Sequence, residues 1–220
     1  MLVQLSLFNN VYADDCSSTQ NEGRYCVAVT VNGPDTEVLA DMVVYLEPLS
    51  DQTLPNSANT VIINQHHKAF APYISVSQTQ QAVRFTNQDD ITHHIYSVAT
   101  KNKFSFKIRA GQSNNDMAFN HANEIAMGCN IHDWMSGYLL VVDTPYFAKT
   151  DALGKAIFNN VIQGKYLVVV WHPQLKTNNN RLVVEKDIYD NTRFSVSLKA
   201  KLESLPKQDS DDDFDFLSDY

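Results

Sequence analysis

Residues 124–142 read EIAMGCNIHDWMSGYLLVV, and this stretch decides the fold class. Residues 124–129 and 137–143 are apolar runs, so each predicts a strand, and the polar residues between them predict a connecting loop. Similar runs, rich in β-branched and aromatic residues, recur at 25–31, 42–48, 60–64, 73–77, 82–86, 104–109, 166–171, 181–185 and 193–198. No segment has a sustained 3.6-residue apolar period. The chain is therefore predicted to be all-β and built of sandwiches.

The loop inside this stretch carries metal-binding side chains at regular spacing. A thiol, an imidazole and a thioether stand at Cys129, His132 and Met135, and a second imidazole source, His93 and His94, lies upstream. Two imidazoles and one thiolate, with a weak thioether on the axis, form the donor set of an electron-transfer copper site. The pattern therefore predicts one copper ion.

Three other interpretations of the loop remain open. A structural zinc site normally has four Cys or His ligands and does not use Met. A catalytic Cys–His pair is conceivable, although a nucleophile is unusual in such a strand–loop–strand cluster. The third interpretation is a buried Cys129 with an unrelated surface His132 and a packing Met135.

Residues 59–143 resemble a cupredoxin, the family of plastocyanin, azurin and amicyanin. The resemblance lies in the C-x-x-H-x-x-M spacing and in residues 70–97, FAPYISVSQTQQAVRFTNQDDITHHIYS. It implies a Greek-key β-sandwich with one type 1 copper ion, bound by His93, Cys129, His132 and Met135. Small cupredoxins usually have Asn after the first ligand His, and His94 stands there instead. Because strand neighbours face opposite ways, we expect His93 to face the metal, with His94 as its outer partner or as a substitute ligand.

The remaining histidines and Trp134 have weaker assignments. His66 and His67 are expected on the surface, with accessory copper binding as the alternative. His121 is expected in a turn and His172 at the end of a strand. Trp134 lies two residues after His132. It is expected either to pack in the core or to belong to an apolar patch through which electrons leave the protein.

The flanking segments, 24–50 and 146–203, resemble a small prealbumin-like or carboxypeptidase-regulatory-type β-sandwich. The copper domain, 59–143, would then be inserted into this discontinuous accessory sandwich at an exposed turn. The whole chain is also similar to exported bacterial proteins labelled "methylamine utilization protein". That label does not identify an amine dehydrogenase as a partner.

The ends of the chain predict export. Residues 1–13 are apolar and end in Val11-Tyr12-Ala13, which suits a signal-peptide remnant, with a frayed strand as the alternative. Cys16 and Cys26 are expected to pair in an exported protein rather than remain free thiols, which leaves Cys129 alone. Residues 204–220 predict an acidic disordered tail that is either solvated or a docking segment.

Charge and length limit the function. The net charge is −8, of which residues 207–220, with one Lys and six Asp, carry −5. Such an acidic chain is not a general nucleic-acid binder, and no apolar run is long enough for a membrane span. We expect a periplasmic copper protein, not an enzyme, that carries single electrons for a c-type cytochrome or a dehydrogenase. The alternatives are copper handling without redox turnover and a metal-free envelope interaction module.

Overall fold

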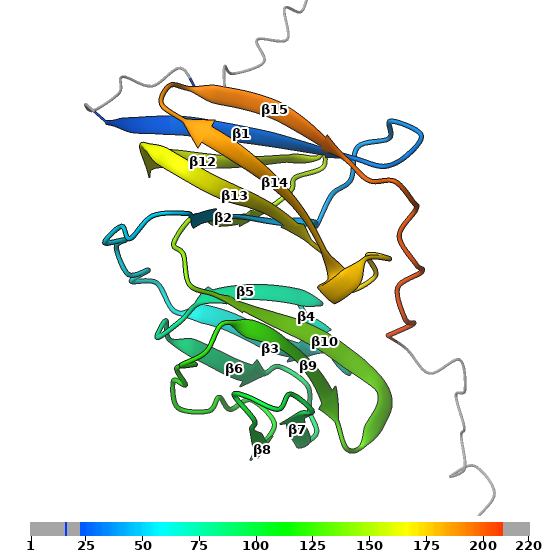
Figure 1. The fold of residues 1–220 in the computed structure, drawn as a ribbon. Helices are drawn as coiled ribbons and strands as arrows, with labels where there is room; N and C mark the ends of the chain where they lie inside the picture. Colours follow the sequence, from blue (N-terminus) through cyan, green and yellow to red (C-terminus); the bar gives the residue numbers. More distant parts are fainter. Residues whose placement is uncertain (1–15, 17–22, 209–220) are drawn as a thin grey trace, which may run out of the picture.

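The computed structural model describes Cys16 and residues 23–208 (Figure 1). Its strands are β1 (Arg24–Asn32), β2 (Val43–Pro48), β3 (Val61–His66), β4 (Ala69–Ala71), β5 (Ile74–Gln78), β6 (Val83–Asn87), β7 (His93–Ser97), β8 (Ser105–Ile108), β9 (Asn123–Cys129), β10 (His132–Val142), β11 (Phe147–Lys149), β12 (Lys155–Ile162), β13 (Gly164–Trp171), β14 (Arg181–Ile188) and β15 (Thr192–Ser197). One short 3-10 helix, η1 (Asn178–Asn180), interrupts them. The predicted all-β class is confirmed. Among the described residues, no helix is long and apolar enough to cross a membrane.

The strands form two layered units, one above the other in Figure 1. Sheets β12-β1-β15 and β11-β2-β13-β14 enclose one apolar core, and sheets β5-β10-β9-β7-β8 and β4-β3-β6 enclose another. The first unit thus takes strands from both ends of the described chain, and the second contains β3 to β10. The division into domains at 24–50, 59–143 and 146–203 stays a prediction.

Alternating burial explains how the second unit forms. In β6, Val83 and Phe85 are fully buried, whereas Arg84 between them is partly exposed. β7 has the same alternation, with Ile95 buried against the same core. Each of these strands therefore covers the core with one face and leaves the other face free to carry polar groups.

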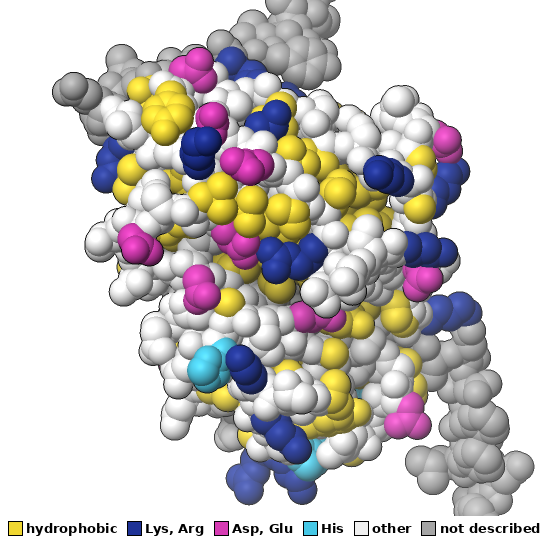
Figure 2. All heavy atoms as spheres, in the orientation of Figure 1, with side chains coloured by type: hydrophobic (Ala, Val, Ile, Leu, Met, Phe, Trp, Pro, Cys, Tyr) yellow, Lys and Arg dark blue, Asp and Glu magenta, His cyan; other side chains and the backbone are white. Residues whose placement is uncertain are grey.

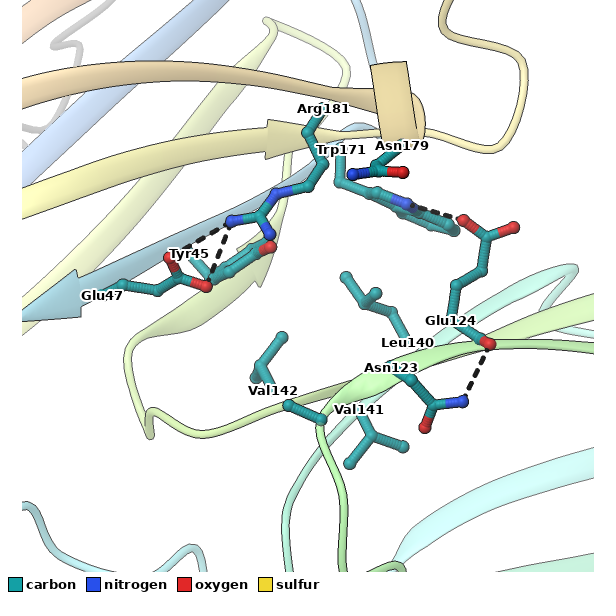
Figure 3. A pocket seen from close by; sticks show the side chains of 11 residues that line it. Tyr45, Glu47, Asn123, Glu124, Leu140, Val141, Val142, Trp171, Asn179 and Arg181 are labelled. Atoms are coloured by element: carbon teal, nitrogen blue, oxygen red, sulfur yellow. Dashed lines mark hydrogen bonds and ion pairs between the residues drawn. The ribbon is translucent and has the colours of Figure 1, made fainter. Parts of the chain in front are cut away.

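The two units meet through a third apolar cluster, formed by Val43, Tyr45, Ile74, Val76, Leu140, Val142, Val169 and Trp171. The Trp171 indole Nε1 donates a hydrogen bond to Glu124 Oε2 in β9, at 3.1 Å. A pocket of about 310 Å³ opens beside this contact (Figure 3). On its far wall Arg181 pairs with Glu47, at 3.1 Å. Apolar packing and a hydrogen bond therefore join the units.

The N-terminal end of the described chain is crosslinked to β1. Cys16 and Cys26 form a disulfide with a Cα–Cα distance of 5.4 Å, which confirms the expected pairing. The free cysteine, Cys129, is buried. The predicted signal-peptide remnant, 1–13, lies outside the described residues, as does most of the predicted acidic tail, 204–220, of which only residues 204–208 are described.

Candidate metal centre

Three strand ends bring the predicted ligands together. Cys129 ends β9, and His132 begins β10 and pairs with Cys129 directly across the hairpin. His93 begins β7, whose Ile95 pairs with Cys129 from the other side. β10 therefore starts five residues before the expected strand at 137. The tight pairing of His132 with Cys129 is the reason.

The donor atoms of these three residues converge. The Cys129 Sγ atom lies 3.5 Å from His93 Nδ1 and 3.8 Å from His132 Nδ1. All three donor atoms lie within 4.8 Å of one another. His93, Cys129 and His132 are 0%, 3% and 8% exposed. The group is thus compact and almost closed to water.

The spacing fits one metal ion. With metal–sulfur and metal–nitrogen bonds of about 2.3 and 2.0 Å, nitrogen and sulfur ligands lie about 3.5–3.8 Å apart at tetrahedral to trigonal angles. The distances from Cys129 Sγ to the two imidazoles match that range. A thiolate with two imidazoles suits copper.

Asp89 orients His93 and was not identified from the sequence. Its Oδ2 atom lies 2.8 Å from His93 Nε2, which donates the hydrogen bond. That bond fixes the tautomer, so the free lone pair of Nδ1 faces Cys129. The only sequence signal was an acidic residue four positions before His93, in the turn that follows β6.

Asp89 is held in the charged state. Burial acts to raise the pKa of its carboxyl group, but hydrogen bonds from His93 and from the backbone N–H groups of Lys68 and His67 outweigh burial, so the pKa is lowered. The backbone bonds measure 2.7 Å from His67 and 3.0 Å from Lys68. The β3–β4 turn therefore holds the carboxylate that positions His93.

His132 is kept neutral by its surroundings. Burial lowers the pKa of its imidazole, and the positive charge of Lys68 adds to that effect, while the smaller effect of Asp89 opposes it. A neutral imidazole offers the lone pair that a metal requires. The Trp134 ring lies 5.1 Å from the His132 ring and also packs against the core, so core packing explains part of its position.

Met135 lies in the irregular start of β10. The register shifts between His132 and Ser136, so residues 133–135 form a bulge. Within this bulge Met135 is only 1% exposed and belongs to the same core cluster as Cys129. Its predicted role as axial ligand stays a prediction.

His94 faces away from Cys129. Its Nδ1 atom lies 3.0 Å from Asn130 Nδ2, and its Nε2 atom lies 2.9 Å from Ser105 Oγ. The Asn130 backbone N–H also donates to the His94 carbonyl oxygen, at 3.0 Å. His94 therefore ties the ligand hairpin to β7 and β8.

The other histidines lie apart from this group. His66 and His67 are exposed at the β3–β4 turn, with stacked rings 3.8 Å apart. His121 is exposed in a bend before β9. His172 directly follows β13 and is buried, and burial lowers its pKa to about 4.

Comparisons with known proteins find similarity among solved structures alone. No protein-family model matches the chain, and no curated protein matches it. A Cu-containing nitrite reductase from Thermus scotoductus is 20% identical over 43% of this chain and 25% of its own, with a TM-score of 0.36. The chain thus spans about a quarter of that protein's length. A purple cupredoxin from Nitrosopumilus maritimus is 18% identical over 37% of this chain and 98% of its own, with a TM-score of 0.33.

A mutant form of amicyanin, in its oxidised state, is 13% identical over 44% of this chain and 98% of its own, with a TM-score of 0.35. The similarity to proteins labelled "methylamine utilization protein" stays a prediction. The assignment of the candidate metal centre therefore rests on the distances and burial of its own residues.

Proposed function

We propose that this chain is a type 1 copper protein that carries single electrons. The observation that supports the proposal is the convergence of His93 Nδ1, Cys129 Sγ and His132 Nδ1 within 4.8 Å in a buried site. Such a fixed, enclosed set of two imidazoles and one thiolate suits an ion that changes charge by one.

Each residue has a defined task in this proposal. A bound copper ion would supply the one-electron change between Cu(I) and Cu(II). Cys129 provides the soft thiolate donor, and His93 is held in its binding tautomer by Asp89. Met135, buried in the same core cluster as Cys129, would supply a thioether to this ion. His132 is the most exposed of the three converging residues, and Ile131 beside it is 52% exposed, so this edge is where electrons would leave.

This assignment makes the chain a carrier and not an enzyme. The two imidazoles, the thiolate and the thioether would hold the ion, and the burial of these side chains excludes water and substrate. A catalytic metal site, by contrast, keeps one position open. The exchange partner is then another redox protein, such as a c-type cytochrome or a dehydrogenase, which docks at the His132 edge.

We place this exchange in the periplasm. The Cys16–Cys26 disulfide supports the placement, because disulfides persist in oxidising compartments. Residues 1–13 support it through their resemblance to the end of a signal peptide.

Copper handling is the second candidate function, and one observation favours it. His66 and His67 are exposed at the turn whose backbone holds Asp89, and the His67 N–H is one of the groups that bind it. An exposed imidazole pair so near the centre could pass copper to or from His93. In that case copper would move between sites without a change of oxidation state.

A redox titration separates the two functions. For a carrier we expect copper to cycle between its two states without loss, and a chelator added in either state to leave it bound. For copper handling, Cu(I) would pass to the chelator, and His66→Ala with His67→Ala would slow that transfer. The same pair of substitutions should leave a carrier's cycle unchanged.

A further inference from the structure

One edge of the metal-binding unit is entirely basic. Between Asp90 and Asp116 the sequence has no acidic residue but four cations, Lys101, Lys103, Lys107 and Arg109. All four are exposed, and none forms an ion pair with another described residue. Figure 2 shows basic side chains gathered at the lower end of the molecule, where Figure 1 places β7 and β8. We call these four residues the basic edge.

The basic edge lies next to the candidate metal centre. It surrounds β8, the last strand of the five-stranded sheet. In the β7–β8 register Lys107 pairs with His94, and Ile108 pairs with His93. The nearest acidic side chain of the ligand hairpin, Asp133, is exposed two strands away from β7, on β10. Asp89 and Asp90 precede β7, and Asp89 is hydrogen-bonded to His93, so no carboxylate within β7 or β8 neutralises the edge.

The chain itself contains a segment of opposite charge. Residues 209–220 carry six Asp and no basic residue, together with Phe214, Phe216 and Leu217. Gln208, directly before them, is anchored beside the ligand hairpin. The Ser136 backbone N–H donates to Gln208 Oε1 at 3.2 Å, and Gln208 Nε2 donates to Ser136 Oγ at 3.0 Å. The acidic segment thus follows a residue that is bonded to the neighbour of Met135.

The strand register gives the distance that the acidic segment must cross. Ser136 pairs with Gly128, Gly128 with Tyr96, and Tyr96 with Ser105, which lies among the four cations. Three strand spacings amount to about 14 Å. Twelve residues can span up to about 40 Å when extended, so the reach is ample.

We propose that residues 209–220 dock on the basic edge of the same chain. Opposite charge and tethering both favour the contact, because a short tether raises the effective concentration to about the millimolar range. The contact itself does not require copper. Its consequence, that the segment competes with a redox partner for the face beside the centre, rests on the proposed function.

Carbodiimide crosslinking of the copper-free full chain tests the contact, because the reagent joins a carboxylate to a touching lysine. We expect crosslinks from Asp residues of 209–219 to Lys101, Lys103 or Lys107 within one molecule. In about 1 M salt, where the Debye length is about 3 Å, these crosslinks should disappear. Mixing isotopically labelled and unlabelled chains separates crosslinks within one molecule from those between two.

Two full-chain variants sharpen the test. Changing Asp211, Asp212 and Asp213 to Asn should lower the crosslink yield by roughly fivefold or more, since half of the acidic charges are removed. Changing Lys165 and Lys199, which are exposed on the other unit, to Glu should leave the yield unchanged. Crosslinks that reach Lys165 and Lys199 equally, or that join only different molecules, would overturn the proposal. So would a yield that the Asn variant does not lower. Because the protein carries no copper, these outcomes are independent of the redox assignment.

Discussion

Asp89 decides how His93 presents its lone pair, although it does not face the thiol itself. Its carboxylate accepts a hydrogen bond from His93 Nε2–H and in turn accepts hydrogen bonds from two backbone N–H groups of the β3–β4 turn. A carboxylate that is hydrogen-bonded to Nε2 makes Nδ1 a stronger electron-pair donor to a metal. A stronger electron-pair donor favours the more highly charged oxidation state of a bound metal.

The first prediction is for Asp89→Asn, which keeps the shape of the side chain but removes its charge. Affinity for Cu(II) should fall by about 10- to 100-fold. The reduction potential should rise, because Cu(II) loses stabilisation. Copper titration and voltammetry measure both quantities. Asp90→Asn, at the exposed neighbouring position, is the matched control, and equal effects of the two variants would contradict the role of Asp89.

The second prediction concerns His172 and acid. The His172 imidazole is 5% exposed, and its Nδ1 atom accepts a hydrogen bond from the Gln174 backbone N–H at 3.2 Å. Burial lowers its pKa from 6.5 to about 4. Between these values the unfolded chain binds a proton that the folded chain does not, so the free energy of unfolding falls as pH falls. The loss should reach about 3 kcal/mol at pH 4 relative to pH 7.

Urea unfolding between pH 4 and pH 7 measures this loss, with His172→Asn as the comparison. Asn keeps an acceptor for the Gln174 N–H but does not titrate. The variant should lose about 3 kcal/mol less than the wild type over the same range. Parallel pH curves for the two proteins would show that another group is responsible.

The sequence predicted the centre better than its surroundings. Cys129, His132 and Met135 follow one another at fixed spacing, so one short loop suffices to suggest them. Asp89 and the contacts of His94 depend on where two turns lie in space. Local pattern does not determine that placement.

At the scale of elements, β10 joins the ligand hairpin to the rest of the sheet. Its first residues pair irregularly with β9, and its last residues pair in parallel with β5. Apolar runs rich in β-branched and aromatic residues predicted most strands. The bulge at residues 133–135 was not predictable, because it results from long-range pairing and not from local preference.

The third prediction is for Gly137→Ala in β10. A Cβ atom there would lie 3.1 Å from the Cβ and Cδ2 atoms of Phe70, whose own backbone is fixed in β4. Overpacking should lower the free energy of unfolding by about 1–3 kcal/mol, measured by urea unfolding.

A second substitution, Phe70→Ala, provides the control for this prediction, because it removes the Cγ and Cδ2 atoms that a Cβ at position 137 would meet. With the smaller side chain in place, Gly137→Ala should cost distinctly less, so the two substitutions should show a coupling energy in a double-mutant cycle. Additive effects would mean that the strain lies elsewhere.

At the scale of the whole molecule, the cluster around Trp171 couples the two units. Trp171 is 1% exposed, and its indole donates to Glu124 of β9, the strand that ends in Cys129. Binding of a metal at the centre should therefore stabilise both units together. The sequence could not predict this contact, because its partners lie 47 residues apart.

The fourth prediction is for Trp171→Ala, which should cost about 3–5 kcal/mol and separate the two units. Trp134 is then the one tryptophan left in the sequence and reports on the metal-binding unit, whereas far-ultraviolet circular dichroism reports on both units. In the variant, copper should raise the unfolding midpoint of the metal-binding unit, which Trp134 reports, more than the unfolding midpoint of the other unit. Coincident transitions, shifted equally by copper, would contradict this coupling.

Charge is also distributed unevenly over the whole molecule. Six of the 25 acidic residues follow Lys207 with no basic residue among them, while the edge next to the centre is basic. The net charge of −8 does not reveal this separation. An acidic docking partner would meet the basic edge, and a basic partner would meet the acidic C-terminal segment.

The visible spectrum after addition of one equivalent of Cu(II) shows whether His93, Cys129 and His132 form a copper centre. The fifth prediction is an intense thiolate-to-copper charge-transfer band in the wild type, and its loss in Cys129→Ser, because Cys129 supplies the thiolate. A colourless wild-type protein, or a band that survives Cys129→Ser, would contradict the account of a copper centre built from His93, Cys129 and His132.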